Sequence, residues 1–487
     1  MPSRRSVLAA LSAGAASALT GCRFGSNDRP SETPPADGTG SPTGESSATS
    51  DATATRTPTA TLTPTGTPAP TPTDRRTPSP TATQTPPPTP TETETETTSP
   101  PPTAVASLTA SDAESYAEFG GSLASVGDAV LVGAEGADAP GAEDAVGAAY
   151  AFERVDGTWT QTARLAPESG DPEGRFGHAG ALSGDRALIA ASELSGTHTI
   201  SSGAAYVYDR SGDDWTRAGT LSTPDDDRDA FGDDVALSGD TVVAGAPHAR
   251  TGDDAVSGAA HVFERVDGGW ERTATLAPDD GGDHDDFGRA VVLDGDRALV
   301  GAPGEPDGTG QGAVYAFARS DGSWTQRAKL VPPERDSEDY VGASLSLEGD
   351  RVLVAAPGED DPNGYFGGAA HTFVASDGEW THEAKLLPDD GDESDAFGES
   401  VALRGDTALV GAEHDEEPNG EDAGSAFLFS RAGAEWAQEA KLLPPDGGPG
   451  ELFGSAATLT DEFGVVGAFY DDHSDIETAG SAFVFEV

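Results

Sequence analysis

Short apolar segments separated by turns repeat through most of the chain. One unit begins at Phe397 with Phe-Gly-Glu-Ser-Val-Ala-Leu, turns at Gly405-Asp406, continues as Thr-Ala-Leu-Val-Gly-Ala, and ends with a segment that contains Trp436. Apolar or alternating runs of about four to eight residues bounded by Gly and Asp are typical of β-strands. The Gly-Asp and Asp-Gly pairs between the runs indicate tight hairpins. The pattern predicts four short antiparallel strands in each unit.

The pair Phe-Gly opens each unit and recurs at intervals of roughly 55 residues. Its first residue stands at seven places, with Val as the one variant: Phe119, Phe176, Phe231, Phe287, Val341, Phe397 and Phe453. The six tryptophans of the chain mark the fourth strand of six units. Radial repetition of four-stranded antiparallel sheets is the architecture of a β-propeller. We therefore predict an all-β fold with a single seven-bladed propeller over residues 104–487.

The seventh unit runs only as far as its third strand, which lies just before Val487. A candidate for the missing strand precedes the first unit, because Ala104-Val-Ala-Ser-Leu108 ends 11 residues before Phe119, the interval that also separates Leu386 from Phe397. Pairing of this segment with the last blade would leave no open sheet edge. We predict that the N-terminal strand closes the ring.

The first residues of the chain carry export and anchoring signals. Arg4 and Arg5 precede an apolar run from Val7 to Leu19, which resembles a twin-arginine signal; a general secretory signal is the alternative. Leu19-Thr20-Gly21-Cys22 matches a lipobox, and Cys22 is the only cysteine of the chain. We expect residues 1–21 to be removed and Cys22 to carry a lipid. The protein would then be anchored to the outer face of the cell membrane.

Residues 22–103 are rich in Thr, Pro and Ser, a composition that cannot bury a core and that is typical of a disordered, extended stalk. The whole chain has 85 acidic against 28 basic residues and a net charge of -57 at pH 7. This charge excludes binding of nucleic acid through its phosphates. Because concentrated salt screens such self-repulsion, the composition favours an extreme halophile, with an archaeon as the expected source; an ordinary acidic secreted protein is the alternative.

The units resemble the FG-GAP repeat family, the propeller repeat of integrin α-subunit heads and of microbial surface proteins. Besides Phe-Gly, the resemblance rests on Gly245-Ala246-Pro247 and Gly301-Ala302-Pro303. It implies binding of a ligand or partner and no chemistry. Calcium-binding members carry a loop of alternating aspartates between strands one and two, and here a bare Gly-Asp turn takes its place. The family's calcium sites are therefore not expected in this chain.

Acidic residues before Phe-Gly are the remaining candidates for a cation site. Asp389, Asp392 and Asp395 lie in one loop, and Asp283 and Asp285 lie in another. Oxygen ligands of this kind suit Ca²⁺. Acids recur two residues before Phe-Gly, as at Asp285 and Asp395, and we favour the interpretation that they fix the turn into strand one. No cofactor is expected, with Ca²⁺ as the weaker alternative.

Other candidate motifs have simpler interpretations. Arg404-Gly405-Asp406 spells an adhesion tripeptide, but other units have Ser, Asp or Glu before the same Gly-Asp turn, so we interpret it as a hairpin. His261 and His371 stand where other units have Tyr or Phe, which indicates packing rather than metal binding. The chain contains no metalloprotease, nucleophile-elbow or P-loop motif, which favours a protein that is not an enzyme.

These observations favour a non-catalytic binding or adhesion module for proteins or glycans at the cell surface. The alternatives are an extracellular hydrolase or lyase with a carboxylate site on the propeller face, and a structural protein of the cell envelope. In a propeller the loops after strands two and four share one rim, opposite the turns after strands one and three. We expect the partner to bind the first of these rims, because it carries the long variable loops.

Overall fold

The computed structural model describes residues 102–487, with gaps at 139–145, 168–174, 193, 196–198, 201–202, 224–228, 251–255, 307, 361–363, 417 and 473–475, and it gives the backbone alone for 194–195 and 199–200. The proposed signal with Arg4 and Arg5, the lipid acceptor Cys22 and the stalk lie outside the described residues. No helix within the described part of the chain is long and apolar enough to cross a membrane.

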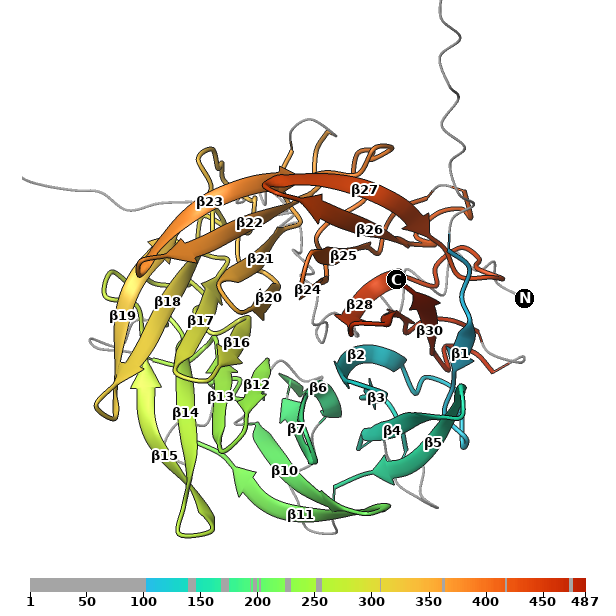
Figure 1. Cartoon of the computed structure of the whole chain (residues 1–487), viewed down its shortest axis with the longest axis horizontal. Helices are drawn as coiled ribbons and strands as arrows, with labels where there is room; N and C mark the ends of the chain where they lie inside the picture. The colour runs from blue at the N-terminus through green and yellow to red at the C-terminus, as the bar shows by residue number, and fades with distance from the viewer. Residues whose placement is uncertain are drawn as a thin grey trace, which may run out of the picture. The chain divides into compact units, whose positions relative to one another are not determined.

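Seven four-stranded antiparallel sheets surround a central axis and form the predicted seven-bladed propeller (Figure 1). Each blade uses one repeat, and strand one lies nearest the axis. The blades are numbered 1 to 7 in chain order. Blade 1 has β2 (Phe119–Val126), β3 (Ala129–Ala134), β4 (Ala148–Val155) and β5 (Thr158–Leu165); blade 2 has β6 (Arg175–Ser183), β7 (Arg186–Ser192), β10 (Ala204–Ser211) and β11 (Asp214–Leu221); blade 3 has β12 (Val235–Ser238), β13 (Thr241–Ala246), β14 (Ala259–Val266) and β15 (Gly269–Leu276); and blade 4 has β16 (Val291–Asp294), β17 (Arg297–Ala302), β18 (Ala313–Ser320) and β19 (Ser323–Leu330). Blade 5 has β20 (Leu345–Glu348), β21 (Arg351–Ala356), β22 (Ala369–Ser376) and β23 (Glu379–Leu386); blade 6 has β24 (Val401–Arg404), β25 (Thr407–Ala412), β26 (Ser425–Ala432) and β27 (Glu435–Leu442); and blade 7 has β28 (Phe453–Leu459), β29 (Phe463–Ala468) and β30 (Ser481–Glu486) with β1 (Ala106–Leu108). A two-stranded hairpin, β8 (Leu194–Ser195) and β9 (Thr199–Ile200), lies between β7 and β10.

The N-terminal strand closes the ring, as the sequence predicts. β1 pairs antiparallel with β30, with Ala106 opposite Val484 and Leu108 opposite Ala482. The Val105 N–H extends the ladder by donating to the Val484 carbonyl oxygen at 2.7 Å. Blade 7 thus takes its outer strand from the other end of the propeller sequence, and Figure 1 shows β1 beside β30.

The first strand of the middle blades is shorter than the repeat pattern predicts. In blades 3 to 6 it begins four residues after the Phe-Gly position, for example at Val401 rather than Phe397. The Phe-Gly glycine has a positive φ both here, with 104° at Gly398, and in blade 1, with 98° at Gly120, so this backbone conformation alone does not set where the strand begins. In blades 1, 2 and 7 the strand includes the Phe-Gly pair, and its pairing with strand two shifts register just after that pair.

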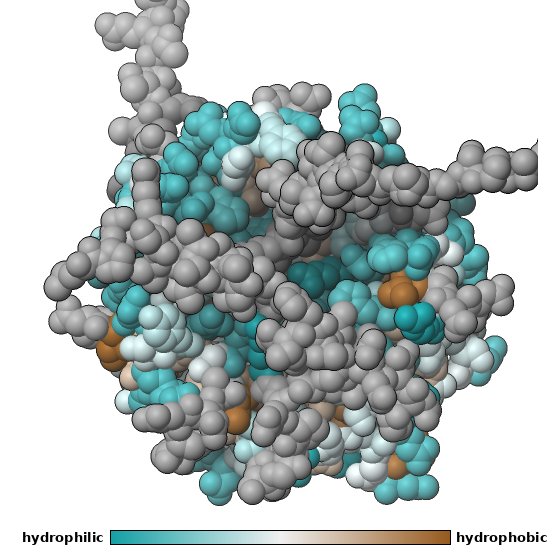
Figure 2. Space-filling model, turned by 180° about the vertical axis from the view of Figure 1, so that it is seen from behind, coloured by the Kyte–Doolittle hydropathy of each residue, from teal (hydrophilic) through white to brown (hydrophobic). Residues whose placement is uncertain are grey.

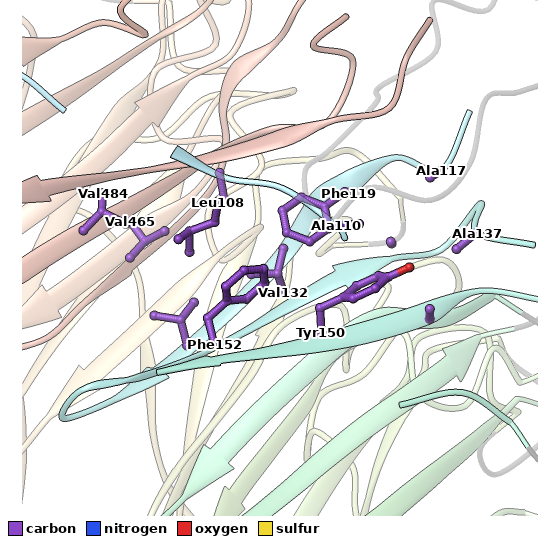
Figure 3. Close-up of a cluster of buried hydrophobic side chains, with 14 of the residues drawn as sticks. Leu108, Ala110, Ala117, Phe119, Val132, Ala137, Tyr150, Phe152, Val465 and Val484 are labelled. Carbon is purple, nitrogen blue, oxygen red and sulfur yellow. The ribbon is translucent and has the colours of Figure 1, made fainter. Parts of the chain in front are cut away.

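The cores lie between neighbouring blades. Figure 3 shows that Phe119, Tyr150 and Phe152 of blade 1 pack against Leu108 and Val484 of blade 7. The Phe119 ring lies 5.5 Å from the Tyr150 ring and 5.9 Å from the Phe152 ring in tilted and edge-on arrangements, which aromatic pairs prefer. The same triangle recurs at Phe397, Phe427 and Phe429 in blade 6. The Phe of Phe-Gly is therefore the central packing residue in the blades that have it, and Val341 takes its place in blade 5.

Candidate functional site

The two rims of the ring differ in the contacts that their charged side chains make. On the rim formed by the turns after strands one and three, which we call the hairpin rim, arginines pair with turn aspartates across blade boundaries. Arg186 Nη1 lies 2.8 Å from Asp240 Oδ1, and Arg297 Nη2 lies 2.9 Å from Asp350 Oδ1. Some aspartates of this rim thus join neighbouring blades, and others, such as Asp296 with Arg319 at 2.6 Å, pair within one blade.

The adhesion-like tripeptide lies on the hairpin rim. Arg404 contacts Asp461 at 2.7 Å and Glu348 at 3.2 Å, and Asp406 forms an ion pair with Arg431. Two-residue turns with aspartates bound to arginine do not supply the six or more oxygens that Ca²⁺ requires. The residues at the family's usual calcium position in this chain do not fit a calcium ion.

The loops after strands two and four form the opposite rim, which we call the loop rim. In three of the loops from strand four to the next blade, a buried aspartate accepts a backbone N–H from three residues earlier: Gly282 N to Asp285 at 2.5 Å, Asp336 N to Asp339 at 2.5 Å, and Asp392 N to Asp395 at 2.7 Å. Each of these aspartates stands between two residues with positive φ, as Asp395 does between Ser394 (75°) and Ala396 (54°). Such a backbone is strained and persists only when its surroundings hold it. The buried acids hold these loops in one conformation.

Burial changes the protonation of these loop acids. The pKa of Asp339 and of Asp395 is raised to about 6 and that of Glu451 to about 7, chiefly by desolvation and in addition by neighbouring carboxylates. Backbone N–H groups that donate to the same carboxylates oppose these increases without cancelling them.

The predicted cation candidates do not converge on one point. Asp283 is exposed, accepts the Val256 N–H at 2.9 Å and lies 3.2 Å from His284. Asp389 and Asp392 are exposed, and the Asp389 N–H donates to the Gln438 side chain at 2.9 Å. Within the described ranges, no group of three or more His, Cys, Asp or Glu side chains is arranged to hold a metal ion.

Three lysines hold the loops after strand two. Each is the penultimate residue of a fourth strand and contacts a buried acid of the same blade: Lys329 Nζ and Glu305 at 2.8 Å, Lys385 Nζ and Glu359 at 2.6 Å, and Lys441 Nζ and Asp415 at 2.6 Å. Sequence reasoning noted that the three lysines share a repeat position but did not identify these partners. The sequence contains a pattern that could have identified these acids, because each stands four residues after the first residue of Gly-Ala-Pro or its variant.

A cavity of about 130 Å³ lies on the axis and is lined by residues of strand one, or directly before it, from all seven blades. Two acids and one arginine stand among apolar residues and serines. Asp233 lies 3.0 Å from Arg289, while Asp234 accepts the N–H of Val235 at 2.8 Å and of Val291 at 2.7 Å. Burial raises the pKa of Asp234 to about 6. Figure 2 shows hydrophilic residues around the centre of one face of the ring.

Next to this cavity, a histidine joins blades 1, 2 and 3. His178 Nδ1 lies 2.8 Å from Glu135, which also contacts Arg175 at 3.0 Å, and His178 Nε2 lies 3.9 Å from Asp233. The residue directly after Phe-Gly varies between blades and includes His178, Asp233 and Arg289. The sequence analysis did not identify this position as a candidate site, although the sequence shows that polar residues vary there from repeat to repeat.

Comparison with known proteins agrees with the repeat structure. A model of the FG-GAP repeat matches residues 102–152, 159–208, 215–263, 270–317, 324–373, 380–429 and 436–485. No curated protein matches the chain. Among solved structures, the periplasmic gluconolactonase PpgL of Pseudomonas aeruginosa is similar over 67% of this chain and 86% of that chain, with 16% identity and a TM-score of 0.42. That likeness is too weak to support a functional argument. Because the seven matched segments cover more than half of its residues, this chain belongs to the FG-GAP repeat family.

Proposed function

We propose that this protein is a non-catalytic binding or adhesion module of the cell surface, anchored through a lipid on Cys22, and that its loop rim binds a protein or glycan. The observation that carries the proposal is the contrast between the rims. Aspartates in the turns after strand one on the hairpin rim pair with arginines, whereas buried acids and lysines contact the described loops of the loop rim around blades 3 to 6. A surface whose loops are held in advance loses little conformational entropy on binding.

The loop rim also presents aromatic side chains. Tyr116 and Tyr365 are 51% and 54% exposed, and they are the aromatic residues among the exposed large hydrophobic side chains of the described chain. Tyr116 lies in a loop after strand four and Tyr365 in a loop after strand two. A tyrosine offers a rigid apolar face and a polar tip, the combination that recurs in recognition surfaces.

Carboxylates accompany both tyrosines. Besides partial desolvation, Glu477 raises the pKa of Tyr116, and Glu338 with Asp360 raises the pKa of Tyr365. Carboxylate oxygens accept hydrogen bonds from sugar hydroxyls or from basic side chains, while the ring stacks against an apolar face. Aromatic rings beside acceptors therefore suit a glycan or a protein partner, and the acidic surface opposes nucleic acid.

The proposal is tested by neutralising equal charge on the two rims. One variant changes Asp283, Asp389 and Asp392 to Asn on the loop rim, and its matched control changes Asp267, Asp321 and Asp377 to Asn in the turns after strand three. The control residues have φ values of 49° to 55°, a conformation that Asn tolerates. Immobilised proteins are incubated with native envelope extract at constant high salt, and retained partners are quantified. We expect loss only in the loop-rim variant, and equal retention by both variants would contradict the proposal.

A hydrolase or lyase is the second candidate, because His178 lies beside the axial cavity and is oriented by Glu135 at 2.8 Å. An imidazole held by a carboxylate is suited to general-base chemistry. Turnover of envelope polysaccharides or peptides by the wild-type protein that His178→Gln abolishes would support this candidate. No turnover by the wild-type protein would leave binding as the function.

A further inference from the structure

Blade 5 brings two histidines next to each other, with their rings tilted by 53°. His371 on β22 and His382 on β23 have their rings 5.3 Å apart, and His371 Nδ1 lies 3.1 Å from His382 Nε2. Other blades hold Tyr at the His371 position, as at Tyr150 and Tyr315, and Gln at the His382 position, as at Gln161. Among the repeats, blade 5 alone combines histidines at both positions.

The orientation of His371 is fixed by a buried ion pair. His371 Nε2 lies 2.7 Å from Glu359 Oε2, and Lys385 Nζ lies 2.6 Å from Glu359 Oε1. Because the lysine keeps Glu359 ionised, Nε2 is the protonated nitrogen that donates to it. The lone pair of Nδ1 is then directed at His382. A histidine whose second nitrogen donates to a carboxylate is the usual arrangement of a metal-binding imidazole.

We propose that His371 Nδ1 and His382 Nε2 together bind a borderline transition-metal ion such as Cu²⁺ or Zn²⁺. With metal–nitrogen distances of about 2.0–2.1 Å, two nitrogens 3.1 Å apart subtend an angle of about 100° at the ion. This angle lies between the right angle of a tetragonal site and the wider angle of a tetrahedral one. Each metal–nitrogen bond would make an angle of about 40° with the line between the two nitrogens, so both rings must rotate to direct their lone pairs at the ion.

The surroundings suit a partly open site. The His371 side chain is only 2% exposed, whereas His382 is half-buried and gives access to solvent. The described residues contain no set of three or more metal-binding side chains, so water completes the coordination. His261 of blade 3 serves as the comparison, because it occupies the position of His371 but contacts Thr275 at 3.2 Å. His261 is therefore a packing residue, whereas His371 and His382 of blade 5 form the proposed metal site.

The test titrates the full chain with Cu²⁺ at constant salt, with calorimetry for affinity and electron paramagnetic resonance for the ligands. His371→Tyr and His382→Gln introduce residues that sister blades hold at the same positions, so both variants should fold. We expect the wild-type protein to bind one ion above the carboxylate background with a two-nitrogen signal, and each variant to lose at least about tenfold in affinity. His261→Tyr is the matched control and should bind like the wild-type protein.

Glu359→Gln tests the positioning role of the carboxylate and should weaken binding by about 10- to 100-fold while both nitrogens stay in the spectrum. Melting of each variant without metal checks that the fold is intact. Equal affinity of the wild-type protein and both histidine variants, or a spectrum with oxygen ligands only, would overturn the proposal. The result does not depend on whether the loop rim binds a partner.

Discussion

Gly411 of blade 6 lies directly against the backbone of Gly454 in blade 7, so that a Cβ atom on Gly411 would come within 1.9 Å of the Gly454 carbonyl oxygen. Gly245 stands in the same relation to Gly288. The first glycine is the Gly of Gly-Ala-Pro, which reads Gly-Ala-Glu in blade 6, and the second is the Gly of Phe-Gly in the next blade. The two halves of the family motif therefore touch each other across each such blade boundary.

The first prediction is that Gly411→Ala lowers the free energy of unfolding by about 3 kcal/mol, because the new methyl group must displace backbone. Denaturant unfolding at constant high salt measures the change. Gly269→Ala is the control, since only one atom lies within 4 Å of its added Cβ, at 3.8 Å. A Gly411→Ala protein as stable as the Gly269→Ala protein would refute this account of the motif.

The second prediction concerns ring closure. Leu108 of β1 is 2% exposed and packs in the core between blades 7 and 1. Leu108→Ala should lower the free energy of unfolding by about 2–5 kcal/mol, and deletion of residues 104–110 should lower it further by exposing the edge of β30. Thermal melting tests both changes. Val105→Ala alters an exposed side chain of the same segment and should melt within a few degrees of the wild-type protein; a loss as large as that of Leu108→Ala would argue against closure by β1.

The third prediction is a fall in stability with rising pH. The pKa values of Asp339, Asp395 and Glu451 are raised to between about 6 and about 7 in the folded protein. Between roughly pH 4.5 and pH 7 the folded state therefore binds more protons than the unfolded state, and the free energy of unfolding decreases as pH rises through this window. Glu451→Gln should reduce the decrease in the free energy of unfolding in the upper part of this pH range. The test measures melting temperatures of the wild-type and Glu451→Gln proteins across this pH range at constant salt. The same dependence of melting temperature on pH in both proteins would contradict the prediction.

The fourth prediction follows from a contact that repeats with the sequence. Gln438 accepts the N–H of Asp389 at 2.9 Å, and Gln326 accepts the N–H of Asp279 at 3.0 Å. Where the loop residue is Pro333, with no N–H to donate, the facing position holds His382 instead of Gln. Gln438→Ala should raise the hydrogen-exchange rate of the Asp389 amide while costing about 1 kcal/mol of stability or less. Gln438→Glu keeps an acceptor and should preserve protection; equal exchange in the two variants would count against the contact.

The fifth prediction concerns the anchor, which lies outside the described residues. Cys22→Ser should release the protein into the medium or leave it unprocessed, because Cys22 is the only thiol available for a lipid. Fractionation of cells and medium, with the size of the protein on gels, measures the outcome. A Cys22→Ser protein of normal size that remains in the membrane fraction would disprove the anchor.

The sequence by itself determined the propeller, the number of blades and the closing strand. These features repeat about every 55 residues, and Phe-Gly, Gly-Asp and Trp fall at fixed places in each repeat. A strand needs only local alternation and turn residues to be recognised, and repetition removes most of the ambiguity that a single short apolar run would leave. The predicted start of strand one was wrong in blades 3 to 6, because the pairing with strand two begins there only four residues after the Phe-Gly position, and an apolar pattern does not encode where pairing begins.

Only the tertiary structure decided which side chains meet. His371 and His382 are 11 residues apart on neighbouring strands, and His178 contacts Glu135 across 43 residues and a blade boundary. The repeat pattern shows only that His371 stands at a packing position, and the sequence analysis assigned it to packing for that reason. Which side chain His371 contacts depends on the register between β22 and β23. Register and blade contacts arise when separate segments bury their apolar faces together, so they become visible only in the folded ring.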